Sequence, residues 1–97
     1  MRLYKINSID DAKALEGEEL GVSDWVVVDQ SKIEKFAIAT GDDQWIHLDQ
    51  NRAKKELPDG KTIAHGYLTL SLVPALTRNF IEVKRLKQMI NFGCNKV

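Results

Sequence analysis

Several features that would assign the chain to particular classes of protein are scarce or absent. Cys94 is the only cysteine among the 97 residues, so no disulfide can form within the chain. Fourteen basic and fourteen acidic side chains cancel, which argues against nucleic acids or acidic membranes as general partners. No apolar run is long enough for a signal peptide or a membrane span, and no repeat or low-complexity segment occurs. We therefore expect one small cytoplasmic domain over residues 1–97.

Helix signals account for much of the first half of the chain. Residues 8–11 (Ser-Ile-Asp-Asp) have the pattern of a capping box and predict a short helix that stops at Gly17. Residues 31–34 (Ser-Lys-Ile-Glu) form a stronger box, and the helix after it should end at Gly41. The apolar face of that helix would carry Ile33, Phe36, Ala37 and Thr40.

Two further helices are expected beyond residue 48. Asp49 should cap a short one, which residues 58–60 (Pro-Asp-Gly) terminate. Residues 63–81 are the most apolar stretch, with leucines four apart and other apolar residues on the remaining faces. A helix that is apolar nearly all round is a buried one. Pro74 should bend it, because proline cannot donate a backbone hydrogen bond.

Only two segments have the pattern of strands. Residues 25–28 (Trp-Val-Val-Val) are β-branched and aromatic, and Ile90, Phe92 and Cys94 alternate with polar residues or glycine. Cys94 would then be a small core residue. Two strands cannot shield a long apolar helix. Either the chain is a fragment, or another chain completes its sheet.

Both histidines lie where chemistry is possible. Asp42 and His47 are five residues apart in a loop that follows a predicted helix, and they could form a proton-transfer pair. His65 and Gly66 stand at the start of the apolar helix, where free backbone N–H groups point outward. Such an N–H can stabilise an oxyanion that develops on a thioester.

Each of these features also has a simpler interpretation. Asp42 and His47 could be a turn with a surface polar pair, Gly66 could serve packing, and His65 could be a capping or partly buried residue. A metal site formed by Asp42, His47 and His65 is conceivable, but the spacing is unlike that of tight ligand sets. A basic group after the apolar helix has the composition of a solvated face, although it could meet CoA phosphates. It consists of Lys84, Arg85 and Lys87.

Two motifs, in order along the chain, resemble those of the MaoC-like dehydratases, also called (R)-specific enoyl-CoA hydratases. The segment 36–49 reads FAIATGDDQWIHLD, and Ala53 fits the small residue that follows in that signature. The segment 63–72 reads IAHGYLTLSL and matches the second family motif. The ending, residues 90–97, resembles the strand after the central helix in the nodulation-protein-N-like branch.

This resemblance implies an α+β hot-dog fold, in which an antiparallel sheet wraps a long central helix. Residues 66–80 would be the central helix, and residues 1–97 would be the N-terminal two-thirds of one such domain. Relatives carry further strands that supply part of the sheet and of the acyl-CoA site. The expected assembly is a homodimer or a larger homo-oligomer.

The resemblance also implies a reaction, the addition of water to trans-2-enoyl thioesters of CoA or an acyl carrier. Asp42 and His47 would activate the water, and the N–H of Gly66 would stabilise the oxyanion. A substitution at Gly66 is then expected to act through steric clash and backbone strain. The residues implied to contact substrate are Gln44, Ile63, His65 and Asn91. No cofactor and no metal is implied, because the chemistry needs only water.

Two alternative functions remain open on the sequence. The chain could be a non-catalytic hot-dog module that binds acyl-CoA or mediates dimerisation, or a hot-dog thioesterase. Against the thioesterase stands the spacing of Asp42 and His47, which is typical of hydratases. Asp43 is adjacent to the proposed carboxylate, but the family motif selects Asp42, and Asp43 should face solvent.

Overall fold

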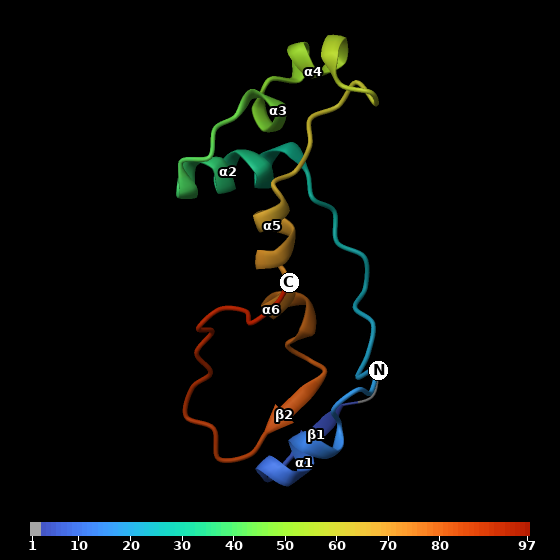
Figure 1. The fold of residues 1–97 in the computed structure, drawn as a ribbon, viewed down its shortest axis with the longest axis vertical. Helices are drawn as coiled ribbons and strands as arrows, with labels where there is room; N and C mark the ends of the chain where they lie inside the picture. The colour runs from blue at the N-terminus through green and yellow to red at the C-terminus, as the bar shows by residue number, and fades with distance from the viewer. Residues whose placement is uncertain (1–2) are drawn as a thin grey trace. The chain divides into compact units, whose positions relative to one another are not determined.

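The computed structural model describes residues 3–97, which form six helices and two short strands (Figure 1). In chain order these are β1 (Tyr4–Ile6), α1 (Ile9–Ala14), α2 (Gln30–Thr40), α3 (Trp45–Leu48), α4 (Gln50–Glu56), α5 (Gly66–Ser71), α6 (Val73–Thr77) and β2 (Ile81–Val83). Residues 23–76 make one compact unit, and the described residues before them make another together with residues 77–97. The expected α+β class is confirmed.

The unit that contains both ends of the described chain is built on a small parallel sheet. Strand β1 pairs with β2 in the register Tyr4–Ile81, Lys5–Glu82 and Ile6–Val83. Phe80, just before β2, is buried, and its ring lies so close to Gly21 that a Cβ there would be 3.2 Å away. The sequence did not predict this sheet, because three residues are too few for a strand periodicity.

Helix α1 begins as its capping signal predicts. Ser8 is the N-cap, and its side chain accepts a hydrogen bond from the Asp11 N–H. The helix ends at Ala14, and a turn follows through Gly17, whose φ is +83°. The predicted element is confirmed, with its end three residues earlier than expected.

Helix α2 starts at Gln30, before the predicted capping box. Asp29 is the N-cap and accepts from the Lys32 N–H at 2.9 Å, so the prediction of Ser31 as cap is wrong. Because the helix begins one residue after Asp29, Ser31 lies within its first turn and not at the capping position. The helix ends at Gly41, whose φ of +80° is the left-handed conformation that glycine favours. Of the predicted apolar face, Ile33 and Ala37 are buried, Phe36 is half-buried and Thr40 is exposed.

Helices α3 and α4 follow each other closely and pack together. Asp49 caps α4, as predicted, by accepting from the Arg52 N–H at 3.0 Å. The Arg52 guanidinium also lies 3.9 Å from the centroid of the Trp45 ring, which stabilises α3 against α4. Ala53 of α4 is fully buried.

The apolar segment 63–81 forms two short helices instead of one bent helix. Helix α5 ends at Ser71 with Leu72 as its C-cap, and Pro74 lies in the first turn of α6, where its missing N–H needs no partner. The predicted break in the helix at Pro74 is confirmed, but the prediction that the segment is buried on nearly all sides is wrong. Leu68 is buried, whereas Tyr67 and Val73 are exposed.

Neither predicted strand forms in the described chain. Residues 25–28 and 90–94 have no strand assignment, and Trp25 and Phe92 are almost wholly exposed. Cys94 is exposed as well, so its expected place in a core is wrong. A strand is defined by hydrogen bonds to a neighbour, and neither segment meets a neighbouring strand among residues 3–97.

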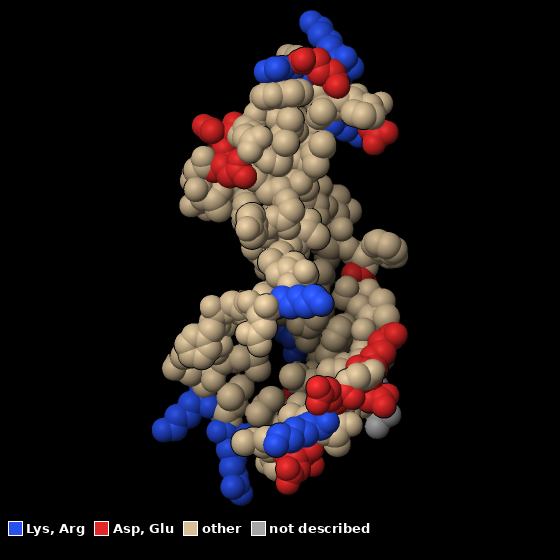
Figure 2. Space-filling model, in the orientation of Figure 1, with Lys and Arg blue, Asp and Glu red and all other residues tan. Residues whose placement is uncertain are grey.

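Charged side chains of neither sign dominate the surface drawn in Figure 2. Side chains of both signs lie on each unit (Figure 2), in keeping with a formal net charge of zero. The basic group Lys84, Arg85 and Lys87 is exposed. None of the described helices is both long and apolar enough to cross a membrane.

Candidate active site

His47 is buried and held in one orientation by the backbone of a distant segment. It lies on α3 and is 7 % exposed, and its Nδ1 is 2.6 Å from the carbonyl oxygen of Ile63. A carbonyl can only accept a hydrogen bond, so Nδ1 carries the proton. The lone pair is therefore on Nε2, which makes Nε2 the basic atom of the ring.

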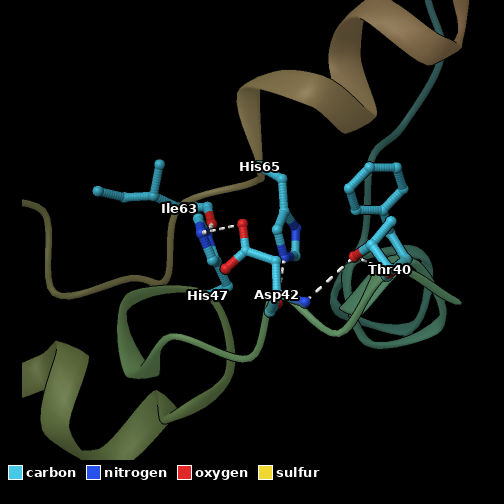
Figure 3. A network of polar contacts seen from close by, with 6 residues as sticks. Thr40, Asp42, His47, Ile63 and His65 are labelled. Carbon is cyan, nitrogen blue, oxygen red and sulfur yellow. Dashed lines mark hydrogen bonds and ion pairs between the residues drawn. The ribbon is translucent and has the colours of Figure 1, made fainter. Parts of the chain in front are cut away.

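Asp42 faces that basic nitrogen. It follows Gly41 directly, at the point where the left-handed glycine turns the chain out of α2, and its N–H donates to Thr40 Oγ1 at 3.3 Å. One carboxylate oxygen lies 4.0 Å from His47 Nε2, and the two groups point toward each other (Figure 3). This separation is too long for a direct hydrogen bond and can be bridged by one water molecule. The Asp42 side chain is 41 % exposed, so the pair is open on one side.

His65 packs against both members of the pair from the interior. It is 2 % exposed, and its Nε2 lies 2.9 Å from the carbonyl oxygen of Asp42. Its ring stacks on the His47 ring, with centroids 3.8 Å apart and planes inclined by 22°. The Phe36 ring lies on α2 with its centroid 4.9 Å from that of His65. The two motifs separated in sequence are thus in direct contact.

Two polar residues that sequence reasoning missed support the same arrangement. The side-chain amide of Gln30 donates to the carbonyl oxygen of His47 at 2.8 Å, and its oxygen accepts from the hydroxyl of Thr62. The Ile63 N–H donates to the Ile46 carbonyl oxygen at 2.9 Å. Nothing in the sequence marked Gln30 or Thr62, because their role depends on which segments pack together.

The predicted substrate-contacting residues fall into different places. Gln44 is exposed and precedes α3, without a side-chain capping bond. Ile63 contributes its backbone to His47, while its side chain is half exposed. Gly66 is exposed at the first position of α5. Asn91 belongs to the other unit, where its side chain accepts from the Gly93 N–H at 3.1 Å.

A metal ion is poorly suited to this group of residues. Asp42, His47 and His65 offer ligand atoms within 4.8 Å of one another. Ligands of one zinc ion, however, must converge on it at about 2.0–2.1 Å. The lone pair of an imidazole lies in the ring plane, and the two ring planes here are stacked and nearly parallel. Lone pairs in two nearly parallel, stacked rings converge poorly on one point, so the two imidazoles are poorly placed to share one ion.

Comparison with known proteins extends over almost the whole chain. The sequence model of the family described as "MaoC like domain" matches residues 11–97. The chain is 50 % identical over 97 residues to 3-hydroxyacyl-thioester dehydratase Z of Mycobacterium tuberculosis (strain ATCC 25618 / H37Rv), covering 100 % of this chain and 62 % of that protein. It is 44 % identical over 93 residues to Nodulation protein N of Rhizobium meliloti (strain 1021), covering 93 % of this chain and 56 % of that protein. The chain thus spans less than two-thirds of the curated relatives it matches.

Proposed function

Because the chain belongs to the family of MaoC-like domains, we propose that it carries the proton-transfer pair of an acyl-thioester hydratase, or dehydratase in the reverse direction. The family resemblance expected from residues 36–49 and 63–72 is confirmed. The single observation that supports the activity is the approach of His47 Nε2 to the Asp42 carboxylate at 4.0 Å. The name of the mycobacterial relative, a 3-hydroxyacyl-thioester dehydratase, supports the same substrate class.

In the proposed reaction, one water molecule sits between the two groups. His47 Nε2 removes a proton from this water, and the oxygen forms a bond to the β-carbon of a trans-2-enoyl thioester. The electrons of the double bond move onto the thioester oxygen. The proton passes from His47 to the nearby Asp42 carboxylate, which delivers it to the α-carbon. The product is a 3-hydroxyacyl thioester of CoA or an acyl carrier, and both side chains return to their starting state.

The Gly66 N–H is the proposed donor to the thioester oxygen. It lies in the first turn of α5, where backbone N–H groups lack partners within the helix, and it adjoins His65 in the chain. Losing such a donor typically costs about 2.7–4 kcal/mol of transition-state stabilisation. The expectation of backbone strain at Gly66 is wrong, because its conformation is helical and a Cβ would meet nothing within 4 Å. A side chain there would act by occupying the space that the thioester needs.

Two exposed residues are proposed to line the acyl chain. They are Gln44, which lies two residues after Asp42 in the chain, and Ile63, whose carbonyl oxygen meets His47 Nδ1. Asn91, in the other unit, stays a predicted contact. His65 is too deeply buried for this role, and another is argued for it below.

We further propose that the complete domain adopts the hot-dog fold and assembles as a homodimer or a larger homo-oligomer. The observation in favour is that Trp25 is 102 % exposed and Phe92 97 % exposed. Additional strands and a second protomer would cover these side chains. Burial of each would contribute roughly 1.5–3 kcal/mol.

The activity is tested with crotonyl-CoA, by following the loss of absorbance of the conjugated thioester. Asp42→Asn and His47→Gln should each lower turnover by roughly 10²–10⁴-fold, because each removes one proton-transfer group. Asp43→Asn is the matched control, since Asp43 is the adjacent, exposed carboxylate, and it should stay within about twofold.

Three other outcomes would contradict the proposal. Unchanged turnover in Asp42→Asn and His47→Gln would show that these two residues are not the proton-transfer pair. Release of free CoA thiol would identify a thioesterase. Acyl-CoA binding without turnover, by a chain that is folded by circular dichroism, would identify a non-catalytic module.

A further inference from the structure

We propose that His65 is a positioning residue, which holds both members of the catalytic pair without touching the substrate. The inference rests on the proposed function, in that it assigns a second role within the same site. Its basis is that one buried imidazole contacts Asp42 through a hydrogen bond and His47 through its ring face.

Burial excludes direct contact between His65 and a bound thioester. At 2 % exposure its ring is enclosed by the Asp42 backbone, the His47 ring and the Phe36 ring. A substrate would have to displace one of these groups to reach it. The ring therefore acts on the reaction only through its neighbours.

The hydrogen-bond partners fix the protonation of the ring. The carbonyl of Asp42 only accepts, so His65 Nε2 carries the proton. His65 Nδ1 is buried and has no hydrogen-bond partner among the described residues. His65 thus meets Asp42 as a hydrogen-bond donor, and its remaining nitrogen faces no polar group of the site.

One short segment thereby positions both catalytic groups. The carbonyl of Ile63 receives the proton of His47 Nδ1, and two residues later the His65 ring donates to the backbone of Asp42. Gln30 anchors the same segment through Thr62 and anchors α3 through the His47 carbonyl. The distance of 4.0 Å between the two reacting groups is thus set by residues 62–65. A displacement of about 1 Å in such a geometry can cost roughly 10²-fold in rate.

Two substitutions separate the hydrogen bond from the ring contact. In His65→Gln the amide nitrogen can occupy the position of Nε2, so the donor to Asp42 is kept and the ring is lost. In His65→Phe the ring against His47 is kept and the donor is lost. Since Nδ1 has no partner, His65→Phe removes no other hydrogen bond.

We expect His65→Phe to lower kcat for crotonyl-CoA by roughly 10–100-fold, with KM within about threefold, because the pair is misplaced while the substrate surface is unchanged. His65→Gln should recover most of the lost kcat. Wild-type kcat in His65→Phe, or a rise in KM with kcat unchanged, would overturn the proposal. The second result would place His65 in the substrate site.

A second measurement needs no turnover and so separates this inference from the proposed function. Long-range nitrogen–proton NMR spectra show which imidazole nitrogen carries the proton, and the chain has only two histidines. We expect His65 protonated on Nε2 and His47 on Nδ1. The carbonyl carbon signal of Asp42 should shift in His65→Phe and remain near its wild-type position in His65→Gln. A His65 ring protonated on Nδ1 with Nε2 bare would overturn the proposal even if the chain turns over no substrate.

Discussion

At the scale of single residues, the site depends on carbonyl oxygens as much as on side chains. The carbonyl of Ile63 accepts from His47 Nδ1 and leaves the lone pair of that ring on Nε2. The carbonyl of Asp42 accepts from His65 Nε2 and leaves the lone pair of that ring on Nδ1. These two assignments follow from hydrogen-bond chemistry alone, because a carbonyl cannot donate. In the proposed reaction the two imidazoles would therefore have different tasks, His47 as the base and His65 as a support.

The hydrogen bond between the Thr62 hydroxyl and the Gln30 side chain gives a prediction at the scale of residues. Thr62→Val keeps the shape of the side chain and removes the hydroxyl that donates to Gln30. We expect a loss of about 0.5–1.5 kcal/mol in the free energy of unfolding, the usual net value of such a hydrogen bond. Urea denaturation measures it. Thr69→Val, at an exposed position on α5, is the control and should change stability by less than about 0.5 kcal/mol. Equal effects of the two substitutions would show that the hydrogen bond from Thr62 to Gln30 does not contribute to stability.

At the scale of elements, the site is assembled where helices end. Asp42 follows the end of α2, His47 lies on the single turn of α3, and His65 precedes α5. Residues at such ends are fixed by capping geometry and at the same time reach outside the helix. The sequence signals for these ends were good at Gly41 and Asp49 and poor at the start of α2. Asp29 and Ser31 are both suitable N-cap residues near the start of α2, and only the folded backbone shows that Asp29 is the N-cap.

Gly41 gives a prediction at the scale of elements. Gly41→Ala would force a Cβ into the left-handed conformation, φ +80°, at a cost of about 1–2 kcal/mol, although no atom lies within 4 Å to clash with it. Thermal or urea unfolding should show this loss. Gly66→Ala is the matched control, because its surroundings are equally open and its backbone is helical, and it should cost no stability. If the two variants were equally stable, the end of α2 would not need its glycine.

At the scale of the whole molecule, the described chain exposes apolar side chains that its own residues do not cover. Trp25, Val27 and Phe92 are between 77 % and 102 % exposed. The chain spans 62 % of the length of its mycobacterial relative. The pattern fits the proposed hot-dog domain, in which further strands and a second protomer supply the missing cover.

Fluorescence of Trp25 tests the proposed assembly. Trp45→Phe leaves Trp25 as the only tryptophan and keeps an aromatic ring beneath Arg52. If protomers associate over this region, the emission of Trp25 should move to shorter wavelength as the protein concentration rises, in step with the mass from sedimentation. Association with an unchanged, water-exposed emission would place the interface elsewhere.

The sequence alone determined most of the helices with capping signals and the family, and it predicted Asp42 and His47 as a proton-transfer pair. These are local properties, since a cap or a motif is complete within a few residues. Tertiary structure decided the rest. It showed that the predicted strands lack neighbours among the described residues, that Gln30 links Thr62 to the backbone of His47, and that His65 is buried against both Asp42 and His47. Each of these depends on segments far apart in the chain, whose contacts no local pattern contains.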